Sequence, residues 1–124
     1  MKDLFIKEGK LSPKVAFDTT DGTLTITGNS TMDDAKTFYK PLFEASQAYS
    51  LQPQKDTLLN IQLTYITNDS AKYLLDLIML MENLHQQNKS AVNVNWYYTN
   101  DNMKQEGENF KLLITTPFNI IASE

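Results

Sequence analysis

Three segments of the chain, at positions 23–27, 59–65 and 92–96, alternate apolar and polar residues. This period-two pattern indicates β-strands that bury one face and leave the other in water. Between them, over 35–49 and 70–85, apolar residues recur at helical spacing. Strands separated by helices favour neighbouring parallel strands joined by crossover connections. The sequence therefore predicts an α/β fold, a two-layer sandwich whose mixed, mostly parallel sheet carries its helices mainly on one face.

The element order reads as β-hairpin, helix, strand, helix, strand, helix, strand. Asp21-Gly22 separates the first two strands and suits a tight turn, which needs a positive backbone φ. The predicted strands cover residues 15–18, 23–27, 56–66, 91–98 and 118–122. The predicted helices cover residues 35–49, 70–85 and 100–114.

The helices carry three local signals. Ser30 lies three residues before Asp33, a spacing that indicates a cap for the first helix. Pro41 lacks an N–H, so it is expected to kink that helix or to mark a restart. Gly107 weakens the helical pattern of the third helix, because glycine costs about 1 kcal/mol in a helix interior.

Size and composition indicate one soluble domain spanning residues 1–124. The net charge of -4 gives no basic field for phosphates, so neither nucleic acid nor an anionic membrane is expected as a partner. The chain has no cysteine, its first ten residues lack a signal-peptide core, and no apolar run is long enough for a membrane span. We therefore expect a cytoplasmic protein.

The polar face of the predicted sheet is a candidate binding surface. It carries the amides of Asn60, Gln62, Asn93 and Asn95, whereas Leu59, Ile61, Leu63 and Tyr65 belong to the apolar face. A solvated face explains these amides without a ligand. The alternative is a small-molecule-binding or enzymatic domain that uses them as ligand contacts.

The second helix has an apolar surface wider than one core-facing stripe. Tyr73, Leu77 and Leu80 adjoin the stripe of Leu74 and Ile78. A wide face packed between flanking helices accounts for this pattern. The alternative is an exposed strip for a partner or for a second copy, which would make a homodimer possible.

Catalytic and metal-binding patterns are absent from the sequence. His85 is the single histidine, with no carboxylate nearby in sequence, and at a helix end its charge would simply suit the dipole. The chain has no Gly-rich phosphate loop, no nucleophile motif and no pair of metal ligands at a recognisable spacing. We therefore expect no enzyme activity, no catalytic residues, no metal and no cofactor.

The segment "LTYITNDSAKYLLDL" turns from strand to helix through four small polar residues, Thr67 to Ser70. Asn, Asp and Ser are preferred helix caps, and a helix start tolerates negative charge because free N–H groups point outward there. Capping explains these residues, and so does a functional anion-tolerant site.

The chain also resembles a known family along nearly its whole length. The similarity lies in "PKVAFDTTDGTLTITGNS", "FYKPLFE" with its mid-helix proline, "LTYITNDSAKYLLDLIMLMENLH", "VNVNWYY", "GENF" and "PFNI", in that order. These residues resemble the SiaC family of regulatory phosphoproteins, whose fold is similar to the STAS domains of anti-anti-sigma factors.

The resemblance implies a partner-switching role in bacterial signal transduction. In that family a kinase phosphorylates a threonine in an "NTSS" stretch, a phosphatase reverses the reaction, and the unmodified protein docks on an output protein such as a diguanylate cyclase. Phosphate would repel an apolar partner without unfolding the domain. The implied contact surface comprises Tyr65, Thr67, Asn68, Asp69, Ser70, Lys72, Tyr73 and Leu77.

This chain departs from the family at the acceptor itself. Aligning Tyr65 and Lys72 with their counterparts places Asn68 at the phosphorylated threonine. Three outcomes follow: the acceptor has moved to Thr67 or Ser70, the protein binds its partner constitutively, or Asp69 holds it partly in a phosphorylated-like state. Full mimicry ranks last, because a carboxylate has less charge and fewer acceptor atoms than phosphate.

Overall fold

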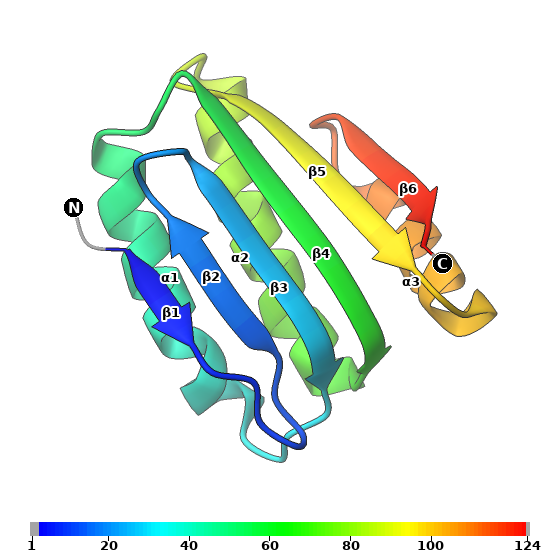
Figure 1. The fold of residues 1–124 in the computed structure, drawn as a ribbon. Coiled ribbons are helices and arrows are strands. Elements are labelled where there is room, and N and C mark those ends of the chain that lie inside the picture. The colour runs from blue at the N-terminus through cyan, green and yellow to red at the C-terminus, as the bar shows by residue number, and fades with distance from the viewer. Residues whose placement is uncertain (1–2, 124) are drawn as a thin grey trace.

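A computed structural model describes residues 3–123, which form a six-stranded sheet and three helices (Figure 1). The strands are β1 (Leu4–Ile6), β2 (Lys14–Asp18), β3 (Thr23–Ser30), β4 (Asp56–Ile66), β5 (Ala91–Tyr98) and β6 (Phe118–Ala122). The helices are α1 (Ala35–Leu51), α2 (Asn68–Gln86) and α3 (Asp101–Leu113).

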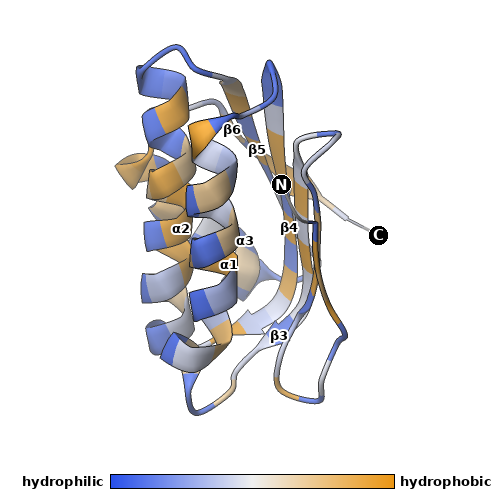
Figure 2. Cartoon of the chain, turned by 90° about the vertical axis from the view of Figure 1, so that its left-hand side faces the viewer, coloured by the Kyte–Doolittle hydropathy of each residue, from blue (hydrophilic) through white to orange (hydrophobic). Residues whose placement is uncertain are grey.

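The strands lie in the sheet in the order in which they occur along the chain. β1, β2 and β3 pair antiparallel, and β3 to β6 pair parallel. Each parallel strand is added on the same side of the previous one, and such crossovers are almost always right-handed. The helices therefore gather on one face, and the other face of the sheet carries none of the described helices (Figure 2). This arrangement confirms the predicted mixed α/β sandwich.

The core fills the space between the helices and the sheet. Trp96, the single tryptophan, is fully buried, and its indole Nε1–H donates to the carbonyl of Met103 at 2.8 Å. Its ring lies 5.0 Å from that of Phe110. The alternating apolar residues of the sheet meet the apolar faces of α1 and α2. The residues from the sheet include Leu24, Ile26, Leu59, Ile61 and Val92. The residues from the two helices include Tyr39, Leu42, Leu74, Ile78 and Met81.

Two glycines have conformations or contacts that a larger residue would disturb. Gly22 has φ of +72°, as the predicted hairpin turn requires. Gly107 packs against Trp96, where an added Cβ would lie 2.5 Å from the indole Cδ1. The glycine that weakened the helical pattern of α3 therefore allows the close approach of α3 to Trp96.

Several local features in the first half of the chain differ from the sequence-based prediction. β1 was not predicted, because its three residues are too few to display a period. Ser30 ends β3 and does not cap α1; Asp34 is the cap, accepting from the Thr37 N–H at 3.1 Å. α1 continues through Pro41 as one helix, so a restart there is excluded.

A β-bulge interrupts the pairing of β3 with β4 near their carboxyl ends. Gly28 pairs with Leu63, but the next residue, Asn29, pairs with Tyr65, so Thr64 is the extra residue on β4. One extra residue reverses which side chains face the helices. Tyr65 is accordingly 57% exposed, and the prediction that it belongs to the apolar face is wrong.

Candidate functional site at the start of α2

Thr67 fixes the point where β4 passes into α2. Its backbone is extended, and its side-chain oxygen accepts from the Ser70 N–H at 3.2 Å. Its own N–H donates to the carbonyl of Ser30 at 3.1 Å, which ties the helix start to the end of β3. The side chain is half-buried. The helix therefore begins at Asn68, two residues before the predicted start.

The first turn of α2 presents polar side chains to solvent. Asn68, Asp69 and Lys72 are all exposed. Asp69 lies in the first turn, where the partial positive charge of the helix N-terminus stabilises a carboxylate. The position that the family resemblance assigns to the acceptor is thus accessible.

Ser70 lies in the interior. It is 0% exposed, and its hydroxyl donates to the sulfur of Met32 at 3.4 Å. A kinase could not reach this hydroxyl without opening the start of α2. The expectation that Ser70 serves as an accessible phosphoacceptor or partner contact is therefore not supported, and Thr67 is the remaining hydroxyl of the four-residue segment.

Tyr65 lies just before this segment and is exposed because of the bulge at Thr64. The same turn is joined to the start of α3, since the Asn100 side-chain amide donates to the Thr64 carbonyl at 2.9 Å. Asn100 also caps α3 by accepting from the Met103 N–H at 2.9 Å. The starts of α2 and α3 are thereby held together at the carboxyl edge of the parallel strands.

A groove between α1 and α2 lies beside the helix start. It has a volume of about 320 Å³ and is lined by Lys36, Tyr39, Lys40, Phe43, Tyr73 and Asp76. The Tyr39 and Tyr73 rings stack at its floor, with their centroids 6.4 Å apart. The Lys72 ammonium lies 5.6 Å from the Tyr73 ring centroid. Tyr73 follows Thr67 by six residues, which is about 9 Å along a helix.

The hydroxyl of Tyr39 is part of the scaffold under this groove. It lies 2.8 Å from the buried hydroxyl of Ser30. Burial raises the pKa of Tyr39 to about 12, although the hydrogen bond with Ser30 opposes this shift. Tyr39 is therefore neutral at physiological pH, and it joins α1 to the end of β3.

The α1 side of the groove was missed at the sequence level. Lys36 and Lys40 are four residues apart, so they share one face of α1 beside Tyr39 and Phe43. A signal was available, because consecutive crossover helices on one face of a sheet are neighbours.

The wide apolar surface of α2 is mostly core. Leu77 is fully buried, and so are Leu74 and Met81. Leu80 and Tyr73 are half-buried. Leu77 therefore cannot contact a partner in this conformation, and a homodimer built on Tyr73, Leu77 and Leu80 would lack its central residue.

The amides of the open sheet face contact one another. The Asn95 side-chain nitrogen donates to the Asn60 oxygen at 3.2 Å, and that of Asn119 donates to the Asn95 oxygen at 3.1 Å. Gln62 donates to the Ser123 hydroxyl at 3.2 Å, and Asn93 is exposed. This ladder accounts for the amides as part of the sheet surface, without a ligand.

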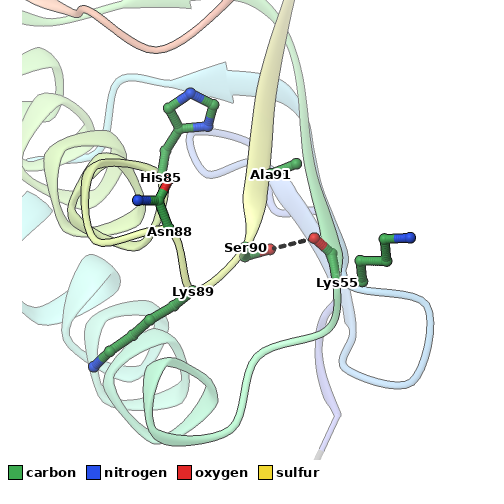
Figure 3. Close-up of a pocket in the computed structure, with 6 residues that line it drawn as sticks. All are labelled: Lys55, His85, Asn88, Lys89, Ser90 and Ala91. Carbon is green, nitrogen blue, oxygen red and sulfur yellow. Dashed lines mark hydrogen bonds between the residues drawn. The ribbon is translucent and has the colours of Figure 1, made fainter.

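His85 lies in a hollow of about 270 Å³ at the opposite end of α2 (Figure 3). Its Nδ1 accepts a hydrogen bond from the Val92 N–H at 3.1 Å. The side chains of Lys55 and Lys89 point in different directions and do not converge on one position (Figure 3). His85 therefore links the end of α2 to β5 through this hydrogen bond.

The described residues contain no cluster of three His, Cys, Asp or Glu side chains that could hold a metal ion. Within 3–123, no helix combines the length and apolarity needed to cross a membrane.

Comparison with known proteins places this geometry in a family. The model of the SiaC family regulatory phosphoprotein matches residues 6–123. An uncharacterized protein of Pseudomonas aeruginosa (strain UCBPP-PA14) is 25% identical over 126 residues, which cover 100% of this chain and 99% of that protein.

Two solved structures are also similar. The crystal structure of apo-SiaC from Pseudomonas aeruginosa superposes with a TM-score of 0.91 at 25% identity, covering 98% of this chain and 100% of that one. A second, at 24% identity with the same TM-score and coverage, is a crystal structure of the diguanylate cyclase SiaD in complex with its activator SiaC from Pseudomonas aeruginosa. The chain belongs to the SiaC family of regulatory phosphoproteins.

Proposed function

We propose that this protein is a non-enzymatic interaction domain of a bacterial signalling system, which docks on an output protein through the start of α2 and the adjoining α1/α2 groove. The observation that carries this proposal is an exposed, polar helix start followed within two turns by an aromatic groove flanked by lysines; Tyr73 of the groove lies about 9 Å along the helix axis from Thr67. Most other apolar residues of these two helices pack in or against the core, although Leu51 of α1 and Met79 of α2 are exposed.

The family supports an output partner of a particular kind. The Pseudomonas aeruginosa SiaC that this chain resembles is described as the activator of a diguanylate cyclase. We extend this role to the present chain and propose a diguanylate cyclase as its output partner. We also propose a kinase and a phosphatase as regulatory partners.

Thr67 is the acceptor that we propose if the switch has been retained. Asn68 has no hydroxyl, and the hydroxyl of Ser70 is buried. The side chain of Thr67 is half-buried at the protein surface, with its oxygen at the helix N-terminus. A phosphate there would add nearly two negative charges next to the groove, and it would repel an acidic or apolar partner surface.

Constitutive binding is the competing state of the same site. It requires only that the exposed surface be left unmodified. A permanent carboxylate at Asp69 gives partial mimicry of phosphate at most, because it carries one charge and two acceptor atoms. The small-molecule and homodimer alternatives have less support, since the face amides bond to one another and Leu77 is buried.

The docking surface is tested by affinity capture from the native cells followed by mass spectrometry of bait and prey. We expect a diguanylate cyclase among the captured proteins. A Lys40→Glu, Tyr73→Ala variant should lose it, whereas Lys89→Glu, which alters a lysine at the far end of α2, should retain it. Equal capture by both variants would contradict the assignment of the groove.

The switch is tested on the captured protein by phosphopeptide mapping, with the co-captured kinase supplied in excess. Thr67→Asn is the matched variant, because asparagine caps a helix as well as threonine but has no hydroxyl. Phosphate on wild type and not on Thr67→Asn supports a relocated switch. A captured partner without phosphate on either protein supports constitutive binding.

A further inference from the structure

Among the strands of residues 3–123, β6 pairs only with β5, so its outer edge is free at the opposite side of the molecule from β1 (Figure 1). The Val94 N–H donates to the Pro117 carbonyl at 2.9 Å, and the Ser123 N–H donates to the Tyr98 carbonyl at 2.8 Å. Odd-numbered residues of this segment therefore direct their backbone groups toward β5. Because these groups alternate along a strand, those of Phe118, Ile120 and Ala122 point to the free edge.

A hollow lies next to this edge, between β6 and α3. Its volume is about 720 Å³, and it is lined by Tyr98, Lys104, Glu108, Lys111, Leu112 and Ile120. Leu112 is 85% exposed, although it is a large apolar residue. β1, at the other edge, has only three residues. The β6 edge thus combines unpaired backbone groups with apolar side chains that an added strand could cover.

The charges around the hollow indicate which strand would fit. Lys104 and Lys111 both line it, and the Lys104 ammonium lies 5.8 Å from the Tyr98 ring centroid. The two lysines are seven residues apart, about 10 Å along the helix. Residues four apart on a strand are about 13 Å apart, a difference that long lysine side chains can span. Glu108 reduces the positive charge between them without cancelling it.

We propose that the edge of β6 and the facing surface of α3 form a docking groove for an extended acidic peptide segment of a partner protein. The segment would pair with β6 as a seventh strand. On the side facing α3, it would place an apolar residue in the hollow and an acidic residue toward each of Lys104 and Lys111. This surface is separate from the α1/α2 groove, so the two proposals can fail independently.

The test uses a synthetic peptide, acetyl-Thr-Asp-Thr-Val-Thr-Glu-Thr-amide, and the full chain labelled with ¹⁵N. We expect saturable binding and about tenfold slower hydrogen exchange at the amides of Phe118, Ile120 and Ala122. The control peptide has Asn and Gln in place of Asp and Glu, and it should bind about tenfold more weakly. No protection of these amides at millimolar peptide would overturn the proposal.

Two variants identify the surface. Ile120→Pro removes an N–H that points to the free edge and leaves the bonds to β5 intact, so it should abolish binding. Lys104→Glu with Lys111→Glu leaves the backbone N–H groups of β6 unchanged and should weaken peptide binding about tenfold. This double variant tests the proposed groove if the proline variant does not fold. Lys36→Glu with Lys40→Glu is the matched control and should bind normally.

Two outcomes would contradict this assignment. Binding that survives Ile120→Pro in a folded protein would place the peptide elsewhere. A dimer of the unliganded chain in sedimentation, abolished by Ile120→Pro, would show that a second copy occupies the edge in place of a partner peptide.

Discussion

Thr67 illustrates how one residue can satisfy two requirements at the same point. Its side-chain oxygen caps α2, and its N–H bonds to the end of β3. Asn68 follows it in the first turn and is exposed to solvent. Position 68 can therefore change its chemistry at little cost to the fold.

A variant at position 68 tests the proposed alignment with the family. Asn68→Thr should accept phosphate from a SiaC-family kinase, because it restores a hydroxyl at an exposed helix start. Intact-mass spectrometry after incubation with the kinase measures this. Asn68→Val, which has the shape of threonine without the hydroxyl, is the control. A folded Asn68→Thr protein that accepts no phosphate would contradict the alignment.

Gly107 has a packing role that outweighs its poor helix propensity. Gly107→Ala should destabilise the protein by about 1–3 kcal/mol, although alanine favours a helix by about 1 kcal/mol. The cause is the clash between an added Cβ and the Trp96 ring. Urea denaturation followed by Trp96 fluorescence measures it. Asn102→Ala, at an exposed position of α3, should instead change stability by only a few tenths of a kcal/mol.

The hydrogen bonds of the Asp34 carboxylate predict that its contribution to the stability of the protein depends on pH. The Thr37 hydroxyl, and secondly the Thr37 N–H, hold the pKa of this carboxyl below its ordinary value of 3.8. Since the folded pKa is lowered, the stabilisation is fully present above the unfolded pKa of about 4 and is lost as pH falls through the folded value. The stability difference between wild type and Asp34→Ala should therefore shrink on acidification.

Urea denaturation at about pH 7 and about pH 3 compares these two proteins. Asp34→Asn is the control, because its neutral side chain can still cap α1 and should respond little to pH. A difference between wild type and Asp34→Ala that stays constant over this range would argue against a stabilising ionised cap.

At the scale of elements, the sequence predicted the parts that depend on local periodicity. The strands 56–66, 91–98 and 118–122 were bounded correctly; alternation is visible in the first two, and the third is a short apolar run that follows Pro117. The start of α2 was placed at Ser70 since it is the last small polar residue; the true start depends on Thr67 accepting a hydrogen bond. The exposure of Tyr65 depends on pairing with β3, which no local pattern reports.

In the candidate site, too, features that depend on local sequence were predicted, and features that depend on distant residues were not. The exposure of Asn68, Asp69 and Lys72 agrees with a helix start read from sequence. The burial of Ser70 could not be predicted, because it depends on Met32 in the distant connection between β3 and α1. The groove was missed because its residues come from two helices, and only the expected adjacency of consecutive crossover helices could have indicated it.

A buried carboxylate on α2 accepts most of the hydrogen bonds between that helix and the connection from α3 to β6, to which Gln86 adds one more. Glu82 Oε2 accepts from the N–H groups of Thr115 and Thr116, at 2.6 and 3.2 Å. Glu82→Leu leaves both donors unpaired and should destabilise the protein by about 2–4 kcal/mol. Glu82→Gln retains an acceptor oxygen and should cost less.

Thermal and urea unfolding measure both Glu82 variants against Asn83→Leu, a change at the neighbouring exposed position. Equal stability of Glu82→Leu and Asn83→Leu would show that the α3–β6 connection does not need this carboxylate.

At the scale of the whole molecule, the sheet is most constrained at its centre. β4 pairs along most of its length with β3 and β5, whereas β1 and β6 each have one neighbour among the described strands. Amides of β4 should therefore exchange only by global unfolding, and those of β1 and β6 should exchange faster through local opening. Native-state hydrogen exchange by NMR measures this order. Uniform protection across all six strands would contradict it.

The bulge at Thr64 has a consequence for how relatives should be aligned with this chain. Apolar alternation carried past Leu63 assigns Tyr65 to the interior and shifts every later assignment in the turn by one residue. The residue assigned to the acceptor lies only four positions beyond the bulge. An alignment through this turn is therefore anchored by the extra residue, Thr64, and by the helix cap, Thr67. Homologues with a different number of residues between the bulge and the cap present a different side chain at the start of the helix.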